Sequence, residues 1–195
     1  VLAAIASLAA PALSEWIGPR AVMAGGIATA GIGMILVFLV PGELHYASVV
    51  VSLCLVGFGM GSLAIGSALI MSGSPENRAG NAAAMEETSY ELGSVVGVAL
   101  LGSIAAVLYR GQLADSEQLA ALDPQVGEAV RESIGSAAAV SQDLGLPGLA
   151  QETGAAFTES MQVTNLIGGL IMLAVAATVF FVIPRGTRLD AKIDD

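Results

Sequence analysis

Four long runs of apolar residues constrain the fold of this chain more than any other feature. Residues 21–40, 47–72 and 161–183 carry no charged side chain. The fourth run, residues 81–109, is just as long but holds three glutamates in its first third. A helix of about 20 consecutive apolar residues crosses the hydrocarbon core of a bilayer. The sequence therefore predicts four transmembrane helices, preceded by the end of another span at residues 1–13.

The apolar runs are continuous, which favours helices over the strands of a membrane barrel, because those strands alternate between apolar and polar residues. Hydrophobic residues make up 55% of the chain and charged residues only 12%, whereas about 25% of the residues of a soluble domain are charged. The 24 glycines are typical of membrane helices that pack closely. We expect an all-α, polytopic transmembrane helix bundle and not a soluble enzyme.

Most of the polar sequence lies in one stretch near the end of the chain. Eight of the 17 acidic residues fall between positions 111 and 160, so the formal net charge of −10 mainly describes this stretch. The predicted organisation is membrane helices over residues 1–109, an extracellular and partly helical polar loop over 110–160, a final transmembrane helix over 161–183 and a cytoplasmic tail over 184–195.

The positively charged residues indicate the orientation, since cytoplasmic loops carry an excess of Lys and Arg. Counted alternately across the membrane, five fall on one side and two on the other. The five are Arg20, Arg78, Arg185, Arg188 and Lys192, and the two are Arg110 and Arg131. This difference places the C-terminus in the cytoplasm and the polar loop outside.

Three carboxylates at the start of residues 81–109 are the main candidates for a functional site. A charge at the centre of a membrane helix costs about 2.5 to 3.5 kcal/mol, so Glu86, Glu87 and Glu91 are expected to have a function. At about 100° per residue, Glu87 and Glu91 lie one turn apart on one face, and Ser94 continues that face. Such a pair can share a proton or bind a cation.

Glu86 points about 100° away from Glu87, in line with Tyr90, Gly93 and Gly97. We interpret Tyr90 and Ser94 as auxiliary polar groups beside the carboxylates. The spacing of Gly93 and Gly97 is that of a GxxxG surface, which favours close packing against another helix.

A cationic solute that replaces a proton on the glutamates would couple its own binding to proton release, which is the linkage that an antiporter needs. An alternative remains open. Because the glutamates lie within ten residues of the helix start, they could sit at the membrane interface, accept helix N-terminal N–H groups, or pair with Arg78 and Arg20.

Other residue patterns exclude several classes of function. Gly57 and Gly61 lie inside an uncharged span instead of at a strand-to-helix turn, so they indicate close helix packing or a flexible gating point and not a nucleotide loop. Cys54 is the only cysteine and His45 the only histidine, which argues against a disulfide, a multi-histidine metal site and a Ser-His-Asp triad. The basic residues are scattered, so nucleic acid is not an expected partner.

One segment of the chain has a recognisable sequence. SPENRAGNAAAMEETSYELGSVVGVALLGS, residues 74–103, resembles the loop and penultimate helix of the fourteen-helix drug:proton antiporters of the major facilitator superfamily, the QacA-like and EmrB-like exporters. The resemblance implies that Glu86, Glu87 and Glu91 take part in protonation and cation recognition. It also implies no cofactor apart from the proton gradient.

The turn LSEWIGPRAV, residues 13–22, is similar to the C-terminal copy of the cytoplasmic gating motif of the same family. Glu15, Gly18 and Arg20 match that motif in kind, whereas Trp16 replaces its usual basic residue. The resemblance implies a C-terminal fragment of a bacterial inner-membrane exporter, whose four complete spans are helices eleven to fourteen. Its expected partners are the lipid bilayer, the missing N-terminal half and lipophilic cationic small molecules.

Two other functions remain open. A proton-coupled carrier of a metabolite or lipid would use the same carboxylates, but an anionic substrate would need basic residues inside the membrane, and these helices contain none. A non-transporting membrane scaffold subunit would be favoured if the three glutamates lie outside the hydrocarbon and face no cavity.

Overall fold

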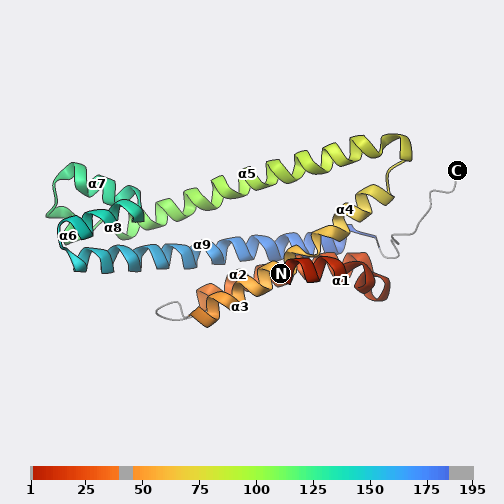
Figure 1. The fold of residues 1–195 in the computed structure, drawn as a ribbon, viewed down its shortest axis with the longest axis horizontal. Helices are drawn as coiled ribbons and strands as arrows, with labels where there is room; N and C mark the ends of the chain where they lie inside the picture. Colours follow the sequence, from red (N-terminus) through yellow and green to blue (C-terminus); the bar gives the residue numbers. More distant parts are fainter. Residues whose placement is uncertain (1, 40–45, 185–195) are drawn as a thin grey trace. The chain divides into compact units, whose positions relative to one another are not determined.

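The computed structural model describes residues 2–39 and 46–184, and over these ranges every regular element is a helix. The elements are α1 (Leu2–Ile17), α2 (Pro19–Leu39), α3 (Tyr46–Met60), α4 (Leu63–Ser72), the 3-10 helix η1 (Glu76–Arg78), α5 (Ala79–Gln112), α6 (Glu117–Ala120), α7 (Pro124–Glu132), α8 (Ile134–Asp143) and α9 (Pro147–Val182) (Figure 1). The prediction of an all-α fold is confirmed.

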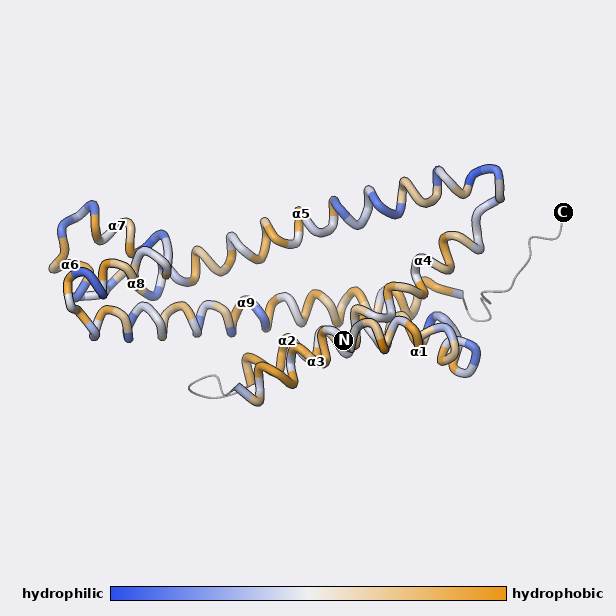
Figure 2. Tube along the Cα trace, in the orientation of Figure 1, coloured by the Kyte–Doolittle hydropathy of each residue, from blue (hydrophilic) through white to orange (hydrophobic). Residues whose placement is uncertain are grey.

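Four segments of the described chain are long and apolar enough to cross a membrane: α2, the α3–α4 pair, α5 and α9. They contain the four predicted spans, except for residue 40, which lies outside the described ranges, and residue 183, which follows the end of α9. Figure 2 shows that hydrophilic residues gather at the connection between α4 and α5 and in α6–α8. The chain is therefore an all-α polytopic bundle, as predicted. The predicted cytoplasmic tail lies outside the described residues, apart from Pro184.

The chain divides into two compact units, which are described separately. Unit 1 comprises residues 1–96 and 165–195, and unit 2 comprises residues 97–164. Helices α5 and α9 each contribute one part to each unit.

In unit 1, α2 and α3 pack with their backbones in close approach. A Cβ atom at Gly59 would lie 2.8 Å from the backbone nitrogen of Ala30, so only glycine allows this contact. Further along the pair, the Ser52 hydroxyl donates a hydrogen bond to the carbonyl oxygen of Gly33 at 2.6 Å. Small residues and interhelical hydrogen bonds are the usual means of helix association in lipid, where burial of apolar surface no longer drives it.

The span predicted as one helix over residues 47–72 is interrupted at Gly61 and Ser62, between α3 and α4. The backbone N–H of Ser62 donates to the Gly59 carbonyl at 3.1 Å, and the Ser62 hydroxyl donates to the same oxygen at 2.7 Å. A Cβ atom at Gly61 would lie 2.7 Å from the backbone nitrogen of Ser7 in α1. The close approach of α1 accounts for the glycine here, and the serine hydroxyl helps to satisfy the freed carbonyl.

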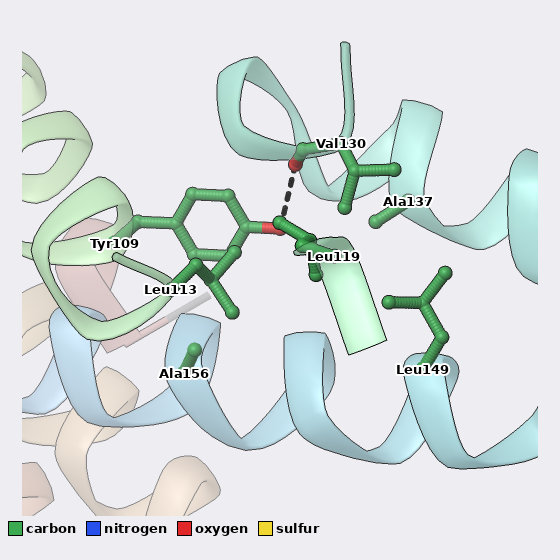
Figure 3. Close-up of a cluster of buried hydrophobic side chains, with 7 residues drawn as sticks. All are labelled: Tyr109, Leu113, Leu119, Val130, Ala137, Leu149 and Ala156. Atoms are coloured by element: carbon green, nitrogen blue, oxygen red, sulfur yellow. Dashed lines mark hydrogen bonds between the residues drawn. The ribbon is translucent and has the colours of Figure 1, made fainter. Parts of the chain in front are cut away.

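Unit 2 shows that the predicted polar loop folds around its own hydrophobic core. Helices α6, α7 and α8 begin at the N-caps Ser116, Asp123 and Ser133, whose side chains accept backbone N–H groups. The buried core comprises Tyr109, Leu113, Leu119, Val130, Ala137, Leu149 and Ala156 (Figure 3). We call this group of residues the cap core.

Tyr109, at the end of α5, ties that helix into the cap core. Its hydroxyl donates a hydrogen bond to the Val130 carbonyl oxygen at 3.2 Å, as Figure 3 shows. Its ring meets Phe157 of α9 edge to face, with the ring centroids 6.3 Å apart. Helix α9 begins at Pro147, well before the predicted transmembrane segment at 161–183, so part of the polar stretch belongs to the last helix.

We expect Leu113→Ala to loosen the cap core. Leu113 is 0% exposed, and truncation of a buried leucine to alanine costs about 2 to 5 kcal/mol of stability. Hydrogen exchange in α6–α8 of the purified protein should therefore become faster. The control is Leu144→Ala, because Leu144 is 55% exposed and its loss should change little. Equal exchange rates in the two variants would show that the cap core does not stabilise these helices.

Candidate functional site

The three candidate glutamates lie on the first part of α5, within unit 1. The chain enters this helix through η1, where the Arg78 backbone N–H donates to the Pro75 carbonyl at 2.8 Å. The helix then runs without a break from Ala79 to Gln112. Glu87 and Glu91 are four residues apart in a continuous helix, so they share one face.

The rest of the described chain leaves this face of α5 open. Glu87 and Glu91 are exposed and Glu86 is half-buried. The auxiliary candidates Tyr90 and Ser94 are also exposed. Of the residues in the apolar window of α2, 44% are buried inside the chain, whereas only 6% are buried in the corresponding window of α5.

The two glycines predicted to pack against another helix also face open space. A Cβ atom at Gly93 or Gly97 would meet no heavy atom of the described chain within 4 Å. Gly61 does pack closely, against α1, and Gly57 is half-buried on α3. Within residues 2–39 and 46–184, the structure thus finds a neighbour for Gly61 but none for the two glycines of α5.

The alternative in which arginines hold the glutamates finds no support in the described chain. Among the side chains that the structure describes, one ion pair is present, between Arg131 Nη1 and Glu128 Oε2 at 3.9 Å in unit 2. Neither Arg20 nor Arg78 pairs with a glutamate of α5.

The polar neighbours of the glutamates are satisfied within α5 itself. The Thr88 hydroxyl donates to the Ala84 carbonyl and the Ser89 hydroxyl to the Met85 carbonyl, each at 2.7 Å. In lipid, hydroxyls bonded in this way carry little penalty. The carboxylates have no such partner among the described side chains.

The predicted gating turn joins α1 to α2. Gly18 has φ +87°, a conformation that side chains with a Cβ rarely adopt, and its backbone N–H donates to the Ser14 carbonyl at 2.9 Å. Glu15 is exposed and does not pair with Arg20 in the described chain. The guanidinium of Arg20 instead lies 3.8 Å from the centroid of the Phe180 ring.

Phe180 is the residue at this turn that sequence reasoning missed. It lies near the end of α9, far from Arg20 in the sequence, and no motif contains both residues. For metals, no group of three His, Cys, Asp or Glu side chains that could hold an ion occurs in residues 2–39 and 46–184.

Comparison with known proteins shows that the chain is similar to an efflux pump. No family model matches the chain. The multidrug efflux pump LfrA of Mycolicibacterium smegmatis is 33% identical over 183 residues, which cover 92% of this chain and 36% of that protein. The chain thus spans little more than a third of the length of the relative it matches.

Proposed function

We propose that this chain forms part of a proton-coupled exporter that exchanges lipophilic cationic compounds for protons. The observation that carries the proposal is the placement of Glu86, Glu87 and Glu91 on one continuous apolar helix without an arginine partner in the described chain. The similarity to a multidrug efflux pump over 92% of the chain supports export as the process.

In this proposal Glu87 and Glu91 act as one binding site that alternates between a proton and a cation. Two carboxylates on one helix face repel each other when both are ionised, so a proton or a cationic solute stabilises the pair. Binding one expels the other, and the proton gradient drives the exchange. Each pH unit of gradient supplies about 1.4 kcal/mol, and each charge that crosses 100 mV supplies about 2.3 kcal/mol.

The neighbouring residues have auxiliary roles. Glu86 provides a third carboxylate on the adjacent face, while Tyr90 offers a ring to a lipophilic cation and Ser94 a hydroxyl beside the pair. Gly93 and Gly97 provide a surface on which a helix of the missing N-terminal half packs closely. Alternating access requires one half of a carrier to move against the other, so this chain alone does not transport.

The orientation proposed from the arginine and lysine count places the turn of Glu15, Gly18 and Arg20 in the cytoplasm of a bacterium, together with the C-terminus. The contact between Arg20 and Phe180 supports this part of the proposal, because it brings the start of α2 to the end of α9. The turn then acts as a cytoplasmic gate, and the carrier needs no cofactor besides the proton gradient.

Dye efflux tests the proposed exchange. Bacteria that lack their main exporters and produce the full-length protein should expel preloaded ethidium faster than cells without it. A protonophore that collapses the gradient should abolish the difference. Efflux that continues at the same rate after addition of the protonophore would exclude proton coupling, and equal efflux with and without the protein would exclude export of this cation.

A further inference from the structure

Helices α2 and α9 of unit 1 meet along a seam that begins at a pair of glycines. A Cβ atom at Gly31 would lie 2.9 Å from the carbonyl oxygen of Gly169, and one at Gly169 would lie 2.7 Å from that of Gly31. Both neighbouring atoms belong to the backbone, so the helices approach as closely as their main chains allow. This contact fixes how the two helices align.

The contact between Arg20 and Phe180 lies in register with the glycine pair. Eleven residues separate Gly31 from Arg20 along α2, and eleven separate Gly169 from Phe180 along α9. Eleven residues make about three helical turns, so each helix presents the same face at both contacts. The two helices are therefore antiparallel, and the Arg20–Phe180 contact lies about three turns from the glycine pair.

The electrostatics of the two helix ends favour this pairing. Arg20 lies in the first turn of α2, where the helix dipole disfavours a positive charge, whereas Phe180 lies in the last turn of α9, where the dipole favours one. The face of an aromatic ring also attracts a guanidinium. The end of α9 thus provides Arg20 with a favourable helix dipole and an aromatic ring face, whereas the start of α2 places it at the unfavourable end of a dipole.

Phe180 and its neighbour Phe181 differ in exposure and in their contact with Arg20. The rings of Phe180 and Phe181 meet edge to face with their centroids 5.7 Å apart. Phe180 is 40% exposed and lies under the guanidinium, whereas Phe181 is 80% exposed. The chain therefore provides a matched pair of phenylalanines, one of which contacts the cation.

We propose that Arg20 and Phe180 form a cation–π clasp that holds the end of α9 against the α1–α2 turn. Phe180 is a positioning residue, since its ring holds the guanidinium of Arg20, which makes no ion pair with Glu15. The last turn of α9 can separate from α2 only when this contact breaks. The clasp is a conformational element of this bundle end, and it stands independently of any transported compound.

Fluorinated phenylalanines separate the cation–π contact from apolar packing, because fluorine weakens the negative ring face while it changes the ring size little. Mono-, di- and trifluorophenylalanine are placed at position 180 of the full-length protein, and hydrogen exchange is measured in the last turn of α9. We expect exchange to become faster with each fluorine, by about two- to fivefold over the series, as a partly exposed cation–π contact predicts. The same series at position 181 should give no trend.

The Arg20→Gln variant completes the test. In this background the dependence of the exchange rate on fluorine at position 180 should disappear, because the cation is gone while the ring remains. An exchange rate that does not change with fluorination at 180, an equal trend at 181, or a trend that persists in the glutamine variant would each overturn the clasp. The measurement needs no transport, so a failed efflux assay would leave it intact.

Discussion

Replacement of both Glu87 and Glu91 by glutamine in the full-length protein should reduce protonophore-sensitive ethidium efflux by about ten- to a hundredfold. Glutamine keeps the size of the side chain but cannot exchange a proton near neutral pH. A hydrogen bond to a charged group contributes about 1.5 to 3 kcal/mol, which corresponds to that range of binding constants. Initial efflux rates, corrected for the amount of protein in the membrane, give the measurement.

Two glutamates outside the apolar runs provide the control for this variant. Glu132 and Glu159 are exposed, and replacing both by glutamine changes the net charge by the same amount. Their variant should keep normal efflux. If the Glu87 and Glu91 double variant still exports ethidium at the normal rate and remains sensitive to the protonophore, these carboxylates do not couple transport.

The single variants show whether the two carboxylates act as one site. If Glu87 and Glu91 share a proton or a cation, losing either one disrupts the site, and the second substitution adds little. Residues in one interacting group are generally non-additive, by about 0.5 to 3 kcal/mol.

The second large effect should follow from one added methyl group in the α2–α9 seam. We expect Gly31→Ala to destabilise the folded protein by about 1 to 3 kcal/mol, the usual range for overpacking. The new Cβ would lie 2.9 Å from the Gly169 carbonyl oxygen, and a backbone atom cannot move away as a side chain can. Unfolding in a denaturing detergent titration measures the change.

Gly25→Ala is the matched control, because a Cβ at Gly25 meets nothing within 4 Å. Alanine favours a helix over glycine by about 1 kcal/mol. The Gly25→Ala variant therefore measures the stability gained from helix propensity without the steric overlap with α9. The stability difference between the two variants isolates the effect of the contact. Equal stability would mean that α2 and α9 do not approach as the structure describes. Gly169→Ala should reduce the stability less in the Gly31→Ala variant than in the original protein, since Gly31→Ala has already separated the helices.

The sequence predicts the membrane helices well because their signal is local. Long uncharged runs such as residues 161–183 require helices in lipid, whatever the tertiary contacts. The angular relation of Glu87 and Glu91 is equally local, and α5 is continuous across both residues. The glycines of residues 47–72 indicate close packing or a flexible point, but the identity of the neighbour of Gly61, which is α1, does not follow from that run.

The cap core and the clasp depend on contacts that are distant in sequence. One face of α9 buries Leu149, Thr153, Ala156 and Ser160. Because two of these four residues are polar, the sequence shows only a weak helical periodicity of hydrophobic residues there. No sequence pattern connects Arg20 with Phe180. Only the matched spacing of both residues from a glycine pair connects them, and that spacing becomes meaningful once the pair is known.

Two of the close contacts of α2 involve partners that are synthesised at different times. The partner of Ala30 is Gly59, on the next helix to emerge, so α2 and α3 can associate early during membrane insertion. The partner of Gly31 is Gly169, more than 100 residues further on, so this contact of α2 forms only after α9 has been synthesised. Docking of α9 onto α2 is therefore a late step relative to the pairing of α2 with α3, and a chain truncated before α9 leaves Gly31 without this contact.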